Sequence, residues 1–222
     1  MHKLQGVLLV VLMLLSSSLF ADESQKKYSF RVAYGFASEK DLGDILLTAD
    51  FSKHPLDLTV IAIDAGYLLK SGLFDLPVDV YAKGGLSKFN EISNFKAGTR
   101  EYTGFSDTYE VLAYIKLLYN LDFADNRVRF GFGEGVSYVN DLLVSEVYDA
   151  TDKSTGSQDP TSRFLNYLDI TVDFDIGRLI GVKSMEDVYV GYLLKHRSGA
   201  FGLYNGVHGG SNYNSLYLEM NF

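Results

Sequence analysis

A histidine and a serine stand two residues apart near the end of the chain, in the sequence LLKHRSG. On one face of a strand His196 and Ser198 would be neighbours, and the imidazole would be placed to take the proton of a serine nucleophile. Because His-x-Ser occurs by chance in many chains, the spacing alone favours a plainer interpretation, in which a strand ends in polar residues. Two other histidines, His54 and His208, fall in predicted loops and are expected to be ordinary surface residues.

A period of two residues runs through the chain and predicts β-strands. In residues 109–119 every odd position holds an apolar or tyrosine side chain, and residues 164–174 and 212–222 alternate in a similar way. A soluble sandwich would alternate too, so the period does not by itself decide the fold class. The candidate strands are 28–36, 57–69, 78–88, 109–119, 128–138, 164–174, 187–198 and 212–222.

Three further features favour an all-β, eight-stranded antiparallel transmembrane β-barrel. The strands have about the length that a tilted strand needs to cross a bilayer, and several have aromatic residues at their ends. The last strand ends in Phe222, which resembles the terminal recognition strand of outer-membrane barrel proteins. Glycines such as Gly131 and Gly133 fall on the inward face, where a narrow barrel is crowded. A porin is disfavoured, since side chains including Tyr81, Lys83, Arg129 and Asp169 should fill so small a barrel.

The connections sort by length as an outer-membrane barrel requires. With the C-terminus on the periplasmic side, the long polar stretches 89–108, 139–163 and 199–211 lie outside, and the shorter 70–77, 120–127 and 175–186 lie inside. Residues 44–52 are assigned to the first outer loop, because a ninth strand would break the even number. Glu134 is a misfit on an apolar face, which predicts either a bulge or a wrong register.

The first 21 residues have the pattern of a cleaved secretory signal peptide: a lysine near the start, a short apolar run and small residues before Ala21. Residues 22–222 then form the barrel domain, exported to the outer membrane. The chain has no cysteine, which excludes disulfides, thiolate metal sites and a cysteine nucleophile. Its formal net charge of -8 argues against nucleic acid as a partner.

The parity of residues 187–198 places His196 and Ser198 on the lipid-facing side of the wall, and Lys195 and Arg197 on the interior side or rim. From about residue 109 onward, and most strongly in residues 193–222, the chain resembles the PagL family of lipid A 3-O-deacylases. The resemblance implies an eight-stranded barrel with a His-x-Ser on the penultimate strand, a glutamate at the start of the last strand and an active site facing the membrane. His196 and Ser198 match the family's histidine and serine.

Two positions depart from the family's pattern. Asn212 stands where the family has its glutamate, on the same outward face as His196. An asparagine can orient a histidine through its carbonyl oxygen but cannot stabilise the imidazolium by charge, and in a serine protease the change from acid to amide costs about ten-thousandfold in turnover. Glu219 is a poor substitute, because its parity points into the lumen. Gly199 stands where the family commonly has asparagine, and its N–H could support an oxyanion.

The sequence therefore predicts a carboxylic ester hydrolase that removes the 3-O-linked hydroxyacyl chain of lipid A, without a metal or cofactor. Ser198 would be the nucleophile, His196 the base, Asn212 the residue that orients His196, and the Gly199 N–H the oxyanion donor. The partner would be lipopolysaccharide in the outer leaflet, and Lys195 and Arg197 could meet lipid A phosphates. The alternative, supported by the missing glutamate, is a catalytically inactive small structural or adhesive outer-membrane barrel.

Overall fold

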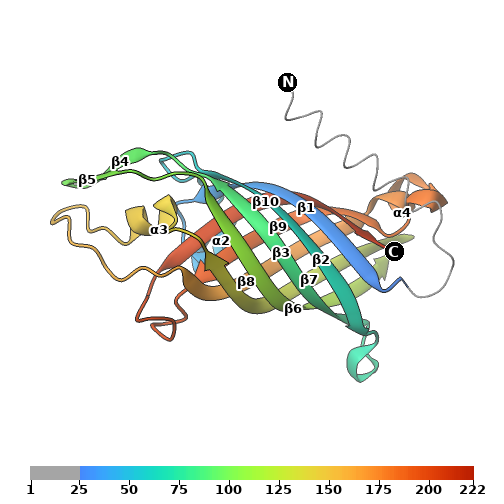
Figure 1. The fold of residues 1–222 in the computed structure, drawn as a ribbon. Coiled ribbons are helices and arrows are strands. Elements are labelled where there is room, and N and C mark those ends of the chain that lie inside the picture. The colour runs from blue at the N-terminus through green and yellow to red at the C-terminus, as the bar shows by residue number, and fades with distance from the viewer. Residues whose placement is uncertain (1–25) are drawn as a thin grey trace.

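The computed structural model describes residues 26–222 and shows a closed antiparallel barrel of eight strands (Figure 1). The predicted signal peptide, residues 1–21, lies outside the described residues. Each barrel strand pairs with its neighbour along the chain, and β1 closes the barrel on β10. The barrel strands are β1 (Tyr28–Ser38), β2 (Thr59–Lys70), β3 (Val78–Asn90), β6 (Thr108–Phe123), β7 (Asn126–Val139), β8 (Phe164–Asp175), β9 (Val188–Ser198) and β10 (Gly210–Asn221).

All eight predicted strands are present, with ends that differ by a few residues. The exposed large apolar side chains lie mainly on the outward face, as the period of two predicts for a wall that faces lipid. The prediction for Glu134 is wrong on both counts. The strand β7 pairs with β6 and β8 without a register shift, so Glu134 lies exposed on a regular outward face between Ile115 and Leu168.

Charged side chains fill the lumen in matched pairs. Arg31 donates to Asp64 over 2.6 Å and to Asp169 over 2.5 Å, and Lys116 also bonds to Asp169. Lys83 lies 2.6 Å from Glu219, so the carboxylate of Glu219 points inward as predicted. Tyr81, Lys83, Arg129 and Asp169 are all buried, in agreement with the prediction that side chains fill the interior.

The end of the barrel with the long loops, called the outer end here, is built up by short elements that the period did not predict. They are α2 (Leu42–Thr48) in the first outer loop, the hairpin of β4 (Asn94–Ala97) and β5 (Arg100–Thr103) in the second, and α3 (Val144–Asp149) in the third. Apolar side chains of the hairpin and α3 pack against the outer ends of the barrel strands, in a buried cluster that includes Phe89, Phe95, Val147 and Tyr213. Residues 44–52 are thus part of the first outer loop and partly helical.

The opposite end, called the inner end here, holds shorter connections. One contains the 3-10 turn η2 (Leu73–Asp75), and another contains α4 (Ile176–Ile180) and the 3-10 turn η3 (Lys183–Met185). The C-terminal end of β10 lies at this end beside the start of β1, where Tyr28 and Phe222 exchange backbone hydrogen bonds of 2.9 Å. Within residues 26–222, none of the helices is both long and apolar enough to span a membrane.

Candidate functional site

His196 and Asn212 form a hydrogen-bonded pair on the outward face of the wall. They are direct partners in the register of β9 and β10, and Nδ1 of His196 lies 2.7 Å from Oδ1 of Asn212. Nδ2 of Asn212 donates to the backbone carbonyl of Lys40 over 2.9 Å. A backbone carbonyl can only accept, so the amide group of Asn212 faces Lys40 and its carbonyl oxygen faces the imidazole.

This arrangement fixes the tautomer of His196. Because Oδ1 of Asn212 accepts, Nδ1 of His196 carries the proton and Nε2 is the nitrogen with a free lone pair. That is the form of histidine that acts as a general base. Asn212 therefore orients the imidazole in the way that a third residue orients the base in serine hydrolases, but without a negative charge.

Ser198 lies on the same face of β9 as His196 and is partly exposed. Its Oγ accepts a hydrogen bond of 3.0 Å from the N–H of Ala200. In the part of the chain that the structure describes, no hydrogen bond joins Ser198 to His196. Residues two apart on a strand are about 6.6 Å apart at Cα, which is close enough for a serine hydroxyl to approach an imidazole on the same face.

Gly199 does not have the free N–H that an oxyanion donor needs. Its N–H donates to the carbonyl of Gly209 over 3.0 Å, across the base of the last outer loop. A Cβ at this position would lie 1.9 Å from the carbonyl oxygen of Val207. Glycine is therefore required here for the close approach of two backbone segments, which is a structural reason that the sequence does not reveal.

Lys195 and Arg197 are not available to lipid phosphates, contrary to that expectation. Both are inward-facing and 1% exposed. Lys195 lies 2.6 Å from Glu110, and Arg197 lies 2.9 Å from Glu146 of α3. Burial raises the pKa of Glu146 above its usual range, while the charge of Arg197 opposes that rise. Arg197 thus holds the third outer loop to the barrel, whereas Lys195 links β9 to β6 inside it.

The two other histidines lie in different surroundings. His208 is exposed in the last outer loop, as predicted. His54 is 2% exposed, so the prediction of a surface residue is wrong. Its ring packs edge-on against Tyr148 with centroids 4.9 Å apart, and its Nε2 lies 3.6 Å from Asp149. His54 thus joins the first outer loop to α3, a structural role that no sequence pattern indicated.

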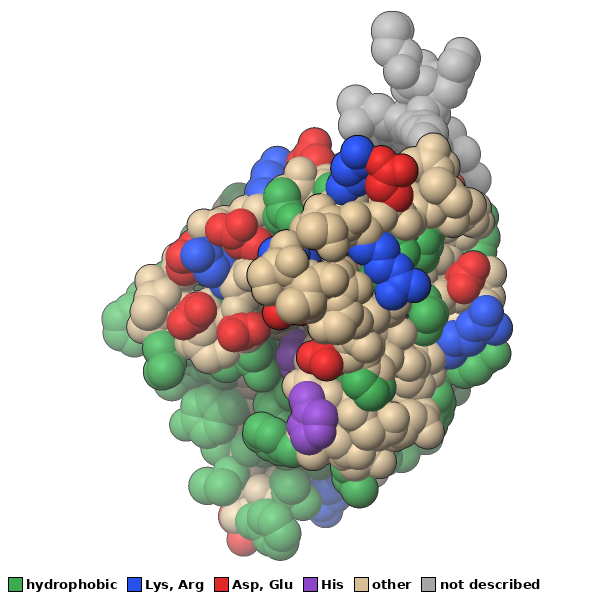
Figure 2. Space-filling view, turned by 90° about the vertical axis from the view of Figure 1, so that its left-hand side faces the viewer, with side chains coloured by type: hydrophobic (Ala, Val, Ile, Leu, Met, Phe, Trp, Pro, Cys, Tyr) green, Lys and Arg blue, Asp and Glu red, His purple; other side chains and the backbone are tan. Residues whose placement is uncertain are grey.

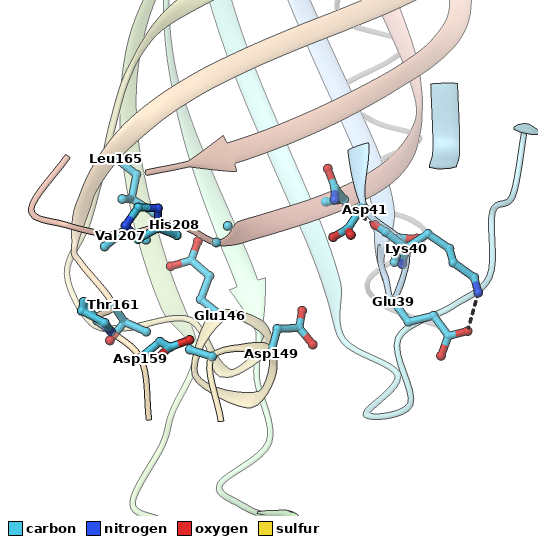
Figure 3. Close-up of a pocket in the computed structure, with 16 residues that line it drawn as sticks. Glu39, Lys40, Asp41, Glu146, Asp149, Asp159, Thr161, Leu165, Val207 and His208 are labelled. Atoms are coloured by element: carbon cyan, nitrogen blue, oxygen red, sulfur yellow. Dashed lines mark hydrogen bonds and ion pairs between the residues drawn. The ribbon is translucent and has the colours of Figure 1, made fainter. Parts of the chain in front are cut away.

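A cavity of about 540 Å³ opens at the outer end beside Asn212, between the first, third and last outer loops (Figure 3). Figure 2 looks onto this end, where acidic and basic side chains lie interspersed. Hydrogen bonds from Lys40 to Asp50 and Glu39 raise the pKa of its ammonium group and hold it against those carboxylates. An acidic lining attracts hydroxyl donors and cations and repels phosphate. The charged and titratable lining residues include Glu39, Lys40, Asp41, Glu146, Asp149, Asp159 and His208.

Among residues 26–222, no three histidine, aspartate or glutamate side chains gather closely enough to hold a metal ion. Sequence reasoning found His196, Asn212 and Ser198, and the structure brings the first two into contact. The contribution of Lys40 could not be found from the sequence. A backbone carbonyl that reaches the site from a loop 172 residues away leaves no signal in it.

No protein-family model matches the chain, and no curated protein sequence matches it. Among solved structures, the chain is similar to the outer membrane enzyme PagL, with 11% sequence identity and a TM-score of 0.53, over 87% of this chain and 99% of that one. It also matches Neisserial surface protein A, at 12% identity over 90% and 100% of the two chains with a TM-score of 0.46. The Yersinia pestis outer membrane protein Ail matches at 7% identity over 88% and 100%, with a TM-score of 0.43. At such identity, the likeness to PagL shows that the two chains share a barrel fold and nothing more.

Proposed function

We propose that this protein is an outer-membrane esterase that removes the 3-O-linked hydroxyacyl chain of lipid A at a site on the outer wall of its barrel. The observation that carries the proposal is the chain of hydrogen bonds from Lys40 through Asn212 to His196, which leaves Nε2 of the histidine as a base. The pair lies on the face of the wall that a lipid substrate would reach by lateral diffusion. The resemblance of residues 193–222 to the PagL family supports the choice of substrate.

The reaction would follow the pattern of serine hydrolases. Nε2 of His196 takes the proton of the Ser198 hydroxyl as Oγ attacks the ester carbonyl, and a tetrahedral oxyanion forms. The bond to the sugar oxygen then breaks, and His196 returns the proton to that oxygen. Water, activated by the same histidine, hydrolyses the acyl-serine and releases the hydroxy fatty acid. No redox step or cofactor is needed for this balance.

The oxyanion needs a donor beside the serine. The N–H of Ala200 donates to Oγ of Ser198, so it lies beside the nucleophile and would have to turn only from Oγ to the oxyanion, whereas the N–H of Gly199 is engaged with Gly209 across the loop. For Gly199 to serve, the base of the last outer loop would have to open. We therefore propose Ala200 as the first donor and Gly199 as a donor only after that rearrangement.

The acidic cavity beside Asn212 suits the polar end of the same substrate. Sugar hydroxyl groups donate hydrogen bonds to carboxylates, whereas the phosphates of lipid A would be repelled by Asp41, Asp149 and Asp159. The sugar near the ester would then face the cavity, and its phosphates would remain outside it.

The test is to express the chain in an outer membrane and to measure the mass of the lipid A. We expect the loss of one hydroxyacyl chain with the native sequence, and unchanged lipid A with Ser198→Ala. Heat-dependent migration on a gel shows in both cases that the barrel is folded. Unchanged lipid A with the folded native barrel would refute the proposal.

A second candidate is a structural or adhesive barrel without catalysis. It is favoured by Asn212 at the glutamate position of the PagL family and by the engaged N–H of Gly199. Under this candidate, Ser198→Ala and the native barrel would leave the lipid equally unchanged, and function would reside in the outer loops.

A further inference from the structure

We propose that the first outer loop, residues 39–58, is a lipid-contacting lid over the His196–Asn212 pair. The interaction surface is the outer side of this loop, and its partner is the acyl layer of the membrane. The lid is inferred from contacts and burial, which do not depend on catalysis. Only the expected effect of the lid on turnover rests on the proposed esterase.

The burial of the outer wall shows where the lid lies. Outward-facing side chains on this barrel are commonly exposed, as in Tyr34 at 59% and Leu216 at 71%. On the same face of β9 and β10, by contrast, Leu194 is fully buried, Asn214 is 3% exposed and His196 is 9% exposed. Side chains that point away from the lumen are buried only if another segment covers them from outside.

The covering segment is identified by one contact on each of three adjacent strands. The ammonium group of Lys53 lies 5.1 Å from the ring centroid of Phe36 on β1. The carbonyl of Lys40 accepts from Asn212 on β10 over 2.9 Å. Phe51 packs edge-on against Tyr192 on β9 with ring centroids 5.5 Å apart. The first outer loop therefore crosses the outside of the wall over the candidate site.

The other side of the loop is apolar and exposed. Within α2, Ile45 is buried at 3% exposure, whereas Leu46 is 51% and Leu47 is 88% exposed. Phe51, in the same loop, is 46% exposed and packs against the wall residue Tyr192. This apolar surface thus continues the lipid-facing band of the barrel, so acyl chains are the partner that fits it.

The base of the loop is held more firmly than the part over the site. A bridge joins Ser38 to Lys53, Oγ of Ser38 donates to the carbonyl of Ser52 over 3.0 Å, and the N–H of His54 donates to the carbonyl of Ala37 over 2.9 Å. The part over the site meets the wall through the Lys40 carbonyl and the ring of Phe51. Opening would break these contacts and leave the base in place, so the loop can hinge there.

The absence of cysteine from the native chain makes the lipid contact directly measurable. A polarity-sensitive fluorophore would be attached to Leu47→Cys, with Leu216→Cys on the bare wall as the lipid-exposed reference and Thr155→Cys in the polar third outer loop as the aqueous control. In vesicles made with brominated phospholipids, we expect Leu47→Cys to be quenched as strongly as Leu216→Cys and Thr155→Cys not to be quenched. Quenching of Leu47→Cys no greater than that of Thr155→Cys would overturn the lipid contact.

The covering role is tested by tethering the lid. Phe51→Cys and Tyr192→Cys, joined by a short reducible thiol cross-linker, should slow the modification of His196 by diethyl pyrocarbonate at least about tenfold, because a tether suppresses the open population. Reduction of the cross-link should restore the rate, with the modified peptide identified by mass. Equal rates in the tethered and reduced protein would show that the loop does not control access.

The two proposals can fail separately. If tethering protects His196 but no form of the protein hydrolyses lipid A, the lid proposal is supported and the esterase proposal is refuted. If lipid A is hydrolysed equally in the tethered and reduced states, the esterase proposal is supported and the lid proposal is refuted. The unlinked double variant controls for loss of the Phe51–Tyr192 contact.

Discussion

The two faces of the β9–β10 strand pair use polar side chains in opposite ways. On the inward face, Lys195 and Arg197 each lie within 3 Å of a buried carboxylate, and Glu219 is held by Lys83 and Arg129. On the outward face, His196 and Asn212 are uncharged partners, and the amide of Asn212 is completed by a loop carbonyl.

The difference separates structure from candidate function. Buried ion pairs fill the narrow lumen, and Lys195, Arg197 and Glu219 are each committed to a partner of opposite charge. A neutral histidine with a defined tautomer, next to a partly exposed serine, keeps one nitrogen free to accept a proton. The same two strands thus carry an inner face of fixed ion pairs and an outer face with a nitrogen that can still accept a proton.

The largest effect should come from breaking the inward network. Asp169→Ala leaves Arg31 and Lys116 buried without their shared carboxylate. We expect a loss of about 3–5 kcal/mol in the free energy of unfolding, because the penalty of an unpaired buried charge is large. Urea unfolding in lipid vesicles measures it. Asp122→Ala, which removes an exposed partner of Arg127, is the matched control and should cost less than about 1 kcal/mol. Similar losses for the two variants would contradict the comparison.

A smaller effect is expected where the outward strand enters the last outer loop. Gly199→Ala would place a methyl group against the carbonyl of Val207, and overpacking of this kind costs about 1–3 kcal/mol. Gly209→Ala is the control, since a Cβ there has open space around it. The thermal unfolding midpoint, measured in detergent micelles, should fall in Gly199→Ala and stay at the native value in Gly209→Ala. If both variants unfold at the native midpoint, Gly199 has no packing role.

A buried carboxyl at the outer end should make the stability of the protein depend on pH. Burial raises the pKa of Glu91 to about 8 from an ordinary value of 4.5, and the nearby carboxyls of Glu146 and Asp107 add to the rise. Folding therefore favours the protonated form, so the contribution of Glu91 to stability falls as the pH increases from 4.5 to 8 and is constant above that. Glu91→Gln should remove this dependence and be more stable than the native protein at pH 9. Equal stability differences between the two proteins at pH 4.5 and pH 9 would show that Glu91 ionises normally.

The smallest effect on stability should come from the outward pair itself. His196→Ala removes a neutral hydrogen bond, which is worth about 1 kcal/mol in folding. Activity should nevertheless fall at least about a thousandfold, because loss of the base removes the route for the serine proton. Unfolding and hydrolysis would be measured on the same vesicle preparation. A loss of stability as large as that of Asp169→Ala would mean that both faces are structural.

Much of the fold follows from the sequence because a strand wall is a local pattern. Parity alone placed His196, Ser198 and Asn212 outward and Lys195, Arg197 and Glu219 inward, and pairing in the structure agrees. It erred at Glu134, because an apolar pattern was taken to forbid a single lipid-facing carboxylate. Regular pairing on both sides shows that the strand tolerates it.

The parts that could not be predicted depend on contacts between loops. The burial of His54 against Tyr148, the engagement of the Gly199 N–H by Gly209, and the Lys40 carbonyl at Asn212 arise from segments with no periodic pattern. Each is set by the tertiary arrangement of the outer end. The types of the site residues were therefore visible in the sequence, whereas their protonation and access were not.

The most direct test is the release of hydroxy fatty acid from lipid A by the purified, folded barrel in vesicles. The native protein should release one 3-hydroxyacyl chain per lipid A over many turnovers, while Ser198→Ala, equally folded, should release none above background. Equal release of fatty acid from the two proteins, or no release from the native protein, would contradict the assignment of chemistry to the outer face.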